Sequence, residues 1–113
     1  MLTIQALTPQ QVTQIYHRHM VRDFPADELK PLDNMLPLMR RGLYRGYGLW
    51  EDGALCAYAL LMTVPDGRVP LLDYLAVVSD RRDHGYGSRF LQLLKAELAD
   101  YDGIVLEAEA VAY

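Results

Sequence analysis

The chain has a single cysteine, Cys56, among its 113 residues, so it cannot close a disulfide within itself. It also lacks a long apolar run. The longest, residues 54–64, is about half the length of a membrane helix and contains a tyrosine and a threonine. Residues 1–5 have neither the basic start nor the long apolar stretch of a signal peptide. Together these absences predict a cytoplasmic protein with no membrane association.

Basic residues are too few to favour nucleic acid as a partner. The chain has 11 Lys and Arg against 15 Asp and Glu, which gives a formal net charge of −4. Binding to a phosphate backbone needs clustered positive charge, and the basic pairs at 40–41 and 81–82 are too small to supply it. No metal site is predicted either, because His17 and His19 stand two residues apart, which on a helix turns their side chains about 200° from each other.

The composition suits one small globular domain spanning residues 1–113. Hydrophobic residues make up 51% of the chain and charged residues 23%, and a chain of this length buries roughly 60–70% of its unfolded surface. No repeat, low-complexity tract or linker divides it. Cys56 lies among Leu55, Ala57 and Tyr58 and is expected to be a small core residue.

Local signals predict the order strand, two helices, three strands, helix, strand. Thr8, Pro9 and Gln11 supply an N-cap, a first-turn proline and a capping-box glutamine for a helix that runs to about residue 22. Pro31 and Pro37 predict two short pieces or a kink within residues 27–41. The remaining predicted elements are a hairpin of strands 43–50 and 54–64, a strand at 70–78, a helix at 88–98 and a last strand from 104 to about 110.

The most specific feature of the sequence lies between the predicted strand at 70–78 and the predicted helix at 88–98. Here an apolar strand containing Leu75-Ala76-Val77 is followed by Arg82, Gly85 and Gly87, and then by an amphipathic helix. Glycines let a ligand approach the backbone, and the free N–H groups of a helix N-terminus attract anions. Arg82 adds a fixed positive charge. The alternative interpretation is a strand, turn and helix whose glycines serve only the turn.

This pattern, Arg/Gln-x-x-Gly-x-Gly/Ala after a Leu-Ala-Val strand, resembles the signature of the GNAT superfamily of GCN5-related N-acetyltransferases. The resemblance implies an α/β (α+β) fold with a mixed, mostly antiparallel sheet flanked by helices. It also implies acetyl-coenzyme A as co-substrate and direct transfer of its acetyl group to the primary amine of a small molecule or a peptide. The implied cofactor-binding residues are Leu75, Ala76, Val77, Arg82, His84, Gly85, Tyr86, Gly87 and Ser88.

Two carboxylates are candidates for the general base that this chemistry needs. Glu107 aligns with a strand glutamate that serves as base in some family members, and Asp73 lies on the same predicted strand as Leu75. Glu107 is the preferred candidate, although strand alternation also allows it to face solvent. Strict alternation places Asp73 on the apolar face of Leu75 and Val77, where an acid needs a partner.

The chain is shorter than a typical family member, which continues with a further helix and two strands and often carries a tyrosine as general acid there. A truncated domain, completion by a second chain, or a domain that binds acetyl-coenzyme A without turnover all fit this length. The non-catalytic binding module is the alternative function, and the open edge of the last strand makes a homodimer plausible. A nucleotide-binding loop ranks last, because no Gly-Lys-Ser/Thr sequence follows the glycines.

Overall fold

The computed structural model describes residues 1–63, 70–82, 84–98 and 110–112. Within these ranges the order of elements matches the predicted one and the fold is mixed α+β. The strands are β1 (Leu2–Ala6), β2 (Tyr44–Glu51), β3 (Ala54–Met62), β4 (Leu71–Val77) and β5 (Ala110–Ala112). The α-helices are α1 (Pro9–Ile15), α2 (Val21–Asp23), α3 (Leu32–Arg40) and α4 (Tyr86–Glu97). A π-helical turn η1 (Tyr16–Met20) joins α1 to α2, and short 3-10 turns form η2 (Ala26–Glu28) and η3 (Ser79–Arg81).

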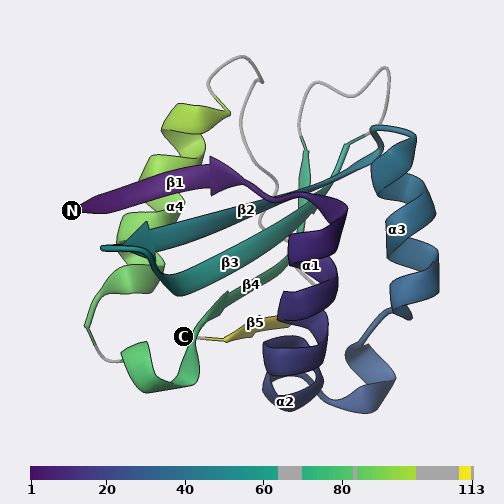
Figure 1. Cartoon of the computed structure of the whole chain (residues 1–113), viewed down its shortest axis with the longest axis horizontal. Helices are drawn as coiled ribbons and strands as arrows, with labels where there is room; N and C mark the ends of the chain where they lie inside the picture. Colours follow the sequence, from purple (N-terminus) through teal and green to yellow (C-terminus); the bar gives the residue numbers. More distant parts are fainter. Residues whose placement is uncertain (64–69, 83, 99–109, 113) are drawn as a thin grey trace.

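The strands form one sheet in the order β1-β2-β3-β4-β5. The first four strands pair antiparallel, and β5 pairs with β4 in parallel. Helices α1 and α3 cover one face of the sheet and α4 covers the other (Figure 1). The molecule therefore has two hydrophobic cores, one on each side of the sheet, and we refer to these sides as the α1 face and the α4 face.

The local signals at the start of the chain form as predicted. The Thr8 hydroxyl accepts a hydrogen bond from the Gln11 backbone N–H, and the Gln11 side chain accepts one from the Thr8 N–H, which completes the capping box. The β2–β3 hairpin turns at Asp52 and Gly53, which both have positive φ as a tight two-residue turn requires. Cys56 is fully buried in the core of the α4 face, as predicted.

Two glycines of β2 leave room for the side chains that pack on the α1 face. A Cβ added at Gly46 would stand 3.0 Å from Leu60 and 3.2 Å from both Leu7 and Val12. A Cβ at Gly48 would meet Trp50 Nε1 at 2.9 Å. Gly46 thus allows close packing between α1 and β2, whereas Gly48 leaves room for the side chains of Trp50, Leu7 and Leu55.

Three boundaries differ from the prediction. Residues 27–41 fall into two short pieces, as predicted, but the division lies before Pro31, between η2 and α3, and α3 continues unbroken over Pro37. Pro37 removes only the hydrogen bond to the Asp33 carbonyl. The helix persists because its buried side chain, Met35, packs against the sheet. Helix α4 begins at Tyr86, two residues before the predicted start. Most of the strand predicted at 104–110 lies outside the described residues; β5 starts at Ala110.

Candidate functional site

The loop before α4 has the geometry of an anion-binding helix N-terminus. Gly85 is the N-cap residue with a φ of 78°, a left-handed conformation that favours glycine, and no side chain of the described residues caps the helix. A Cβ added at Gly85 would meet no atom within 4 Å, so the space above the loop is open. Phe90 and Leu94 fix the helix by packing fully buried on the α4 face. The first N–H groups of α4 therefore have no partner within the helix and lie beside open space.

The predicted phosphate ligand Arg82 has two partners within the protein. Its Nε donates to the Val77 carbonyl at 3.2 Å, and its Nη2 donates to Asp23 Oδ1 at 3.0 Å. The Arg82 side chain keeps one third of its surface exposed, whereas that of Asp23 keeps only 7%. Within the described chain, the Arg82 Nη1 has no partner. The guanidinium thus joins the end of β4 to α2 and retains one nitrogen for a ligand.

Asp23 also accepts a hydrogen bond from the buried hydroxyl of Tyr58, with a distance of 2.7 Å to Oδ2. Burial, together with the bond to this carboxylate, raises the pKa of Tyr58 well above its usual range. The His19 ring lies 6.2 Å from the Tyr58 ring, and burial lowers the pKa of His19. This cluster of Asp23, Tyr58 and Arg82 was not predicted, because its members lie up to 59 residues apart in sequence.

A bulge in β4 determines where Asp73 lies. Leu60 pairs with Tyr74 and Leu61 pairs with Leu72, so Asp73 is the extra residue between two registered pairs. As a result Leu72 and Leu75 both pack on the α4 face, although alternation would place them on opposite faces. The prediction that Asp73 shares the face of Leu75 is wrong for this reason. Its carboxylate instead contacts residues on the α1 face.

Asp73 is a buried carboxylate, 1% exposed, with two strong partners. Its Oδ2 accepts hydrogen bonds from the Tyr44 hydroxyl and from the Lys30 ammonium, both at 2.6 Å. The Lys30 side chain is about one third exposed, so the ion pair extends from the core to the surface. The partner that an acid in apolar surroundings requires is therefore present.

The segment between α2 and α3 lies against β4 through a second set of contacts. The Phe24 ring packs edge-on against the Tyr74 ring at 5.0 Å. The Tyr74 hydroxyl donates to the Glu28 carbonyl at 2.7 Å and accepts from the Lys30 backbone N–H at 2.9 Å. Residues 23–30 are consequently fixed over β4 at both ends, by Asp23 to Arg82 and by Lys30 to Asp73.

The other predicted site residues occupy three environments. Leu75, Ala76 and Val77 are buried in β4, and β5 already pairs with residues 74–76. His84 and Ser88 are exposed and Gly87 is buried. The Tyr86 hydroxyl donates to Glu51 at 2.8 Å, so this side chain ties the start of α4 to the β2–β3 hairpin. Glu107 lies outside the described residues.

None of the helices in the described ranges has the length and apolarity of a membrane span. In the same ranges, no three His, Cys, Asp or Glu side chains gather as a metal-binding group.

The mixed sheet with helices on both faces and the strand–loop–helix unit that ends β4 define an α+β domain whose helix N-terminus, uncapped among the described residues, is of the kind that attracts anions. The model of the acetyltransferase (GNAT) family matches residues 10–112, and the chain belongs to this family. No curated protein matches the chain by sequence.

Solved structures share the fold. A ribosomal-protein-alanine N-acetyltransferase from Brucella melitensis biovar Abortus 2308 is 20% identical with a TM-score of 0.65, over 96% of this chain and 81% of its own. The ribosomal-protein-S18-alanine N-acetyltransferase from Escherichia coli is 24% identical with a TM-score of 0.63, over 87% of this chain and 59% of its own. The GNAT-like decarboxylase GphF, in complex with isobutyryl-CoA, is 17% identical with a TM-score of 0.65, over 83% of this chain and 57% of its own.

Proposed function

We propose that this chain binds acetyl-coenzyme A at the N-terminus of α4 and transfers the acetyl group to a primary amine of a small molecule or a peptide. The family match supports the reaction class. The observation that carries the proposal for this chain is the uncapped start of α4 behind Gly85, at the end of β4 and beside open space. A structural neighbour that holds an acyl-coenzyme A is consistent with this ligand.

The loop residues bind the diphosphate mainly through their backbone. The N–H groups of Gly85, Tyr86, Gly87 and Ser88 face the phosphates, and the helix dipole adds to the attraction. Arg82 holds the loop in place through the Val77 carbonyl and offers Nη1 to a phosphate oxygen. His84 is exposed beside this loop.

The acyl-bearing arm lies at the carboxyl end of β4. Because β5 pairs with residues 74–76, the arm uses the backbone near Val77, beyond that pairing. Residues 23–30 then form the opposite wall, because Phe24 and Lys30 contact the β4 residues Tyr74 and Asp73. The amine acceptor approaches from this wall.

Acetyl-coenzyme A supplies an activated carbonyl carbon in a thioester. The substrate nitrogen forms a bond to that carbon, the carbon–sulfur bond breaks, and the sulfur leaves as a thiolate that takes up a proton. The amine must be neutral to attack, so a carboxylate, directly or through a water molecule, accepts the proton that the nitrogen loses. We assign this role to Glu107. Asp73 is the second candidate, but its Oδ2 already accepts two hydrogen bonds, which favours a positioning role for it.

The test is calorimetric titration of the chain with acetyl-coenzyme A, using Ser88→Glu as the variant. A carboxylate in the first turn of α4 complements the helix dipole, so the fold is expected to be unchanged or slightly more stable. The same charge repels the diphosphate, and we expect binding to weaken by about tenfold or more. Ser88→Gln has a similar size without the charge, and Gln92→Glu adds the charge one turn further along α4.

Both control variants are expected to bind acetyl-coenzyme A like the original chain. Equal affinity of Ser88→Glu and Ser88→Gln would contradict the site. Turnover is then measured by release of the free thiol with a panel of amines, and Glu107→Gln is expected to lower the turnover rate without loss of coenzyme binding. Binding without turnover on every amine would instead support a non-catalytic acetyl-coenzyme A module.

A further inference from the structure

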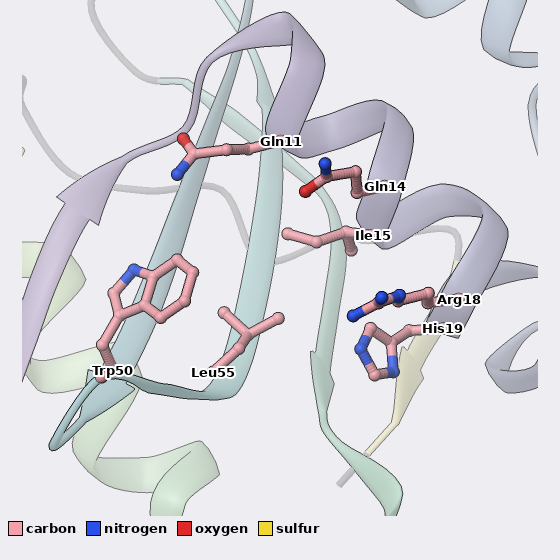
Figure 2. Close-up of a pocket in the computed structure, with 8 residues that line it drawn as sticks. Gln11, Gln14, Ile15, Arg18, His19, Trp50 and Leu55 are labelled. Carbon is pink, nitrogen blue, oxygen red and sulfur yellow. The ribbon is translucent and has the colours of Figure 1, made fainter.

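A pocket of about 280 Å³ opens on the α1 face, between the first helix and the end of the β2–β3 hairpin. Helix residues Gln11, Gln14, Ile15, Arg18 and His19 form one side, and Trp50, Gly53 and Leu55 form the other. Figure 2 shows the Arg18 side chain extending from the helix toward Leu55, and the six-membered ring of Trp50 facing the same gap. The volume is near the lower end of the roughly 300–1,000 Å³ of ligand pockets, so it suits a small molecule.

The polar groups of this pocket are mainly hydrogen-bond donors. The Arg18 guanidinium, which can only donate, has no ion-pair or hydrogen-bond partner among the described residues. The Gln11 amide oxygen already accepts from the Thr8 N–H, so its free group toward the pocket is the amide NH₂. A cationic, donor-rich wall of this kind is complementary to an anion with planar oxygens.

Three carboxylates near the pocket, on Asp23, Asp52 and Glu51, have partners elsewhere, and Asp80, which also acts electrostatically on His19, does not line the pocket. Asp23, which is near His19, is bound by Tyr58 and Arg82. Asp52, next to Gly53 in the hairpin turn, accepts from the N-terminal ammonium group at 3.2 Å. Glu51 is bound by Tyr86 and Arg81, which belong to the α4 region. Among the described residues that line the pocket, Arg18 is the one with a charged side chain.

The opposite wall is apolar and includes a partly buried aromatic ring. Trp50 and Leu55 contribute to the core of the α1 face while lining the pocket. The Trp50 Nε1 is buried and has no hydrogen-bond partner in the described structure, so the ring contributes its hydrocarbon surface here. A ligand could therefore pack an apolar body on the Trp50 ring while its charged group pairs with Arg18 in the same pocket.

We infer that this pocket is a binding site for a small organic carboxylate with an aromatic or aliphatic body, separate from the acetyl-coenzyme A loop at α4. The carboxylate pairs with Arg18, and the body lies on Trp50 and Leu55. The inference does not depend on the proposed acetyl transfer, because it rests on the pocket alone.

Trp50 is the single tryptophan of the chain and reports directly on occupancy of this pocket. The experiment titrates the protein in low-salt buffer with 3-phenylpropionate, and separately with the uncharged 3-phenylpropionamide, while tryptophan fluorescence is recorded. We expect a saturable change with the carboxylate at concentrations about tenfold or more below those needed for the amide. This comparison uses the unaltered chain, so it does not depend on a variant that folds poorly.

Variants then locate the charge. Arg18→Gln is expected to weaken binding of the carboxylate by about tenfold or more and to leave the amide titration unchanged. Arg22→Gln removes an exposed cation of α2 that does not line the pocket, and Ser88→Glu alters the α4 loop; both are expected to leave the carboxylate titration unchanged. No saturable response, equal binding of the amide, or an equal effect of Arg22→Gln or Ser88→Glu would each overturn the inference.

Discussion

Removing one buried hydroxyl tests how strongly the Asp73 cluster holds β4 in place. The variant Tyr44→Phe deletes only the oxygen that donates to Asp73 at 2.6 Å and leaves the ring in the core. Tyr44 is 2% exposed and Asp73 1%, so water cannot replace the lost bond. A hydrogen bond to a charged group contributes about 1.5–3 kcal/mol, and we expect the free energy of unfolding to fall by that amount.

Urea unfolding measures this change as a shift of the midpoint, by about 0.5–3 M for a domain with a typical urea dependence. Tyr47→Phe is the matched control. Tyr47 lies on the same strand but faces the other core, and its hydroxyl has no hydrogen-bond partner among the described residues. We expect Tyr47→Phe to change the unfolding free energy by less than about 0.5 kcal/mol.

A double-mutant cycle separates the bond to Asp73 from other effects of the hydroxyl. In an Asp73→Asn background the acceptor charge is absent, so Tyr44→Phe should cost about 1 kcal/mol less than it does in the original chain. If Tyr44→Phe is as mild as the Tyr47→Phe control, or if the cycle shows no coupling, the Asp73 carboxylate is not held as the structure shows. Asp73 would then have no positioning role.

Three further predictions follow from individual contacts. Gly46→Ala should destabilise the fold by about 1–3 kcal/mol in urea unfolding, because its Cβ would crowd Leu60 at 3.0 Å. Arg82→Gln leaves the buried Asp23 carboxylate without its cation, so it should destabilise the fold. The expected loss is about 1–3 kcal/mol, which is reduced because the Arg82 side chain is partly exposed. Burial lowers the pKa of His19, so the unfolded chain binds more protons than the folded one just below pH 6.5. The free energy of unfolding should therefore fall as the pH drops through that range. His19→Gln should reduce this dependence of the unfolding free energy on pH.

Features that depend on neighbouring residues were predictable from the sequence. The capping box of Thr8 and Gln11 needs only a spacing of three residues, and the turn at Asp52 and Gly53 needs only two residues that tolerate positive φ. The strand–loop–helix unit around Gly85 was also predictable from neighbouring residues, since its glycines lie within a few positions of the start of the helix. These local signals determined the element order.

Features that depend on distant residues were not predictable in this way. The face of Asp73 follows from a bulge, which exists because β3 and β4 shift register between Leu60 and Leu61. No pattern within β4 itself marks that shift. The pairing of Asp23 with Arg82 joins positions 59 residues apart, so only the folded chain reveals it.

The two polar clusters suggest why β4 can serve as the central strand of a site. Asp73 and Arg82 stand at either end of residues 74–77, and each forms an ion pair with the same short segment, at Lys30 and Asp23. Apolar packing alone tolerates small sliding of one element over another, whereas ion pairs of 2.6 and 3.0 Å tolerate very little. The separation between residues 23–30 and β4 is thus fixed at two points. Under the proposed function this separation sets the space in which an amine meets the thioester, so weakening either ion pair should impair acetyl transfer more than it impairs coenzyme binding at α4.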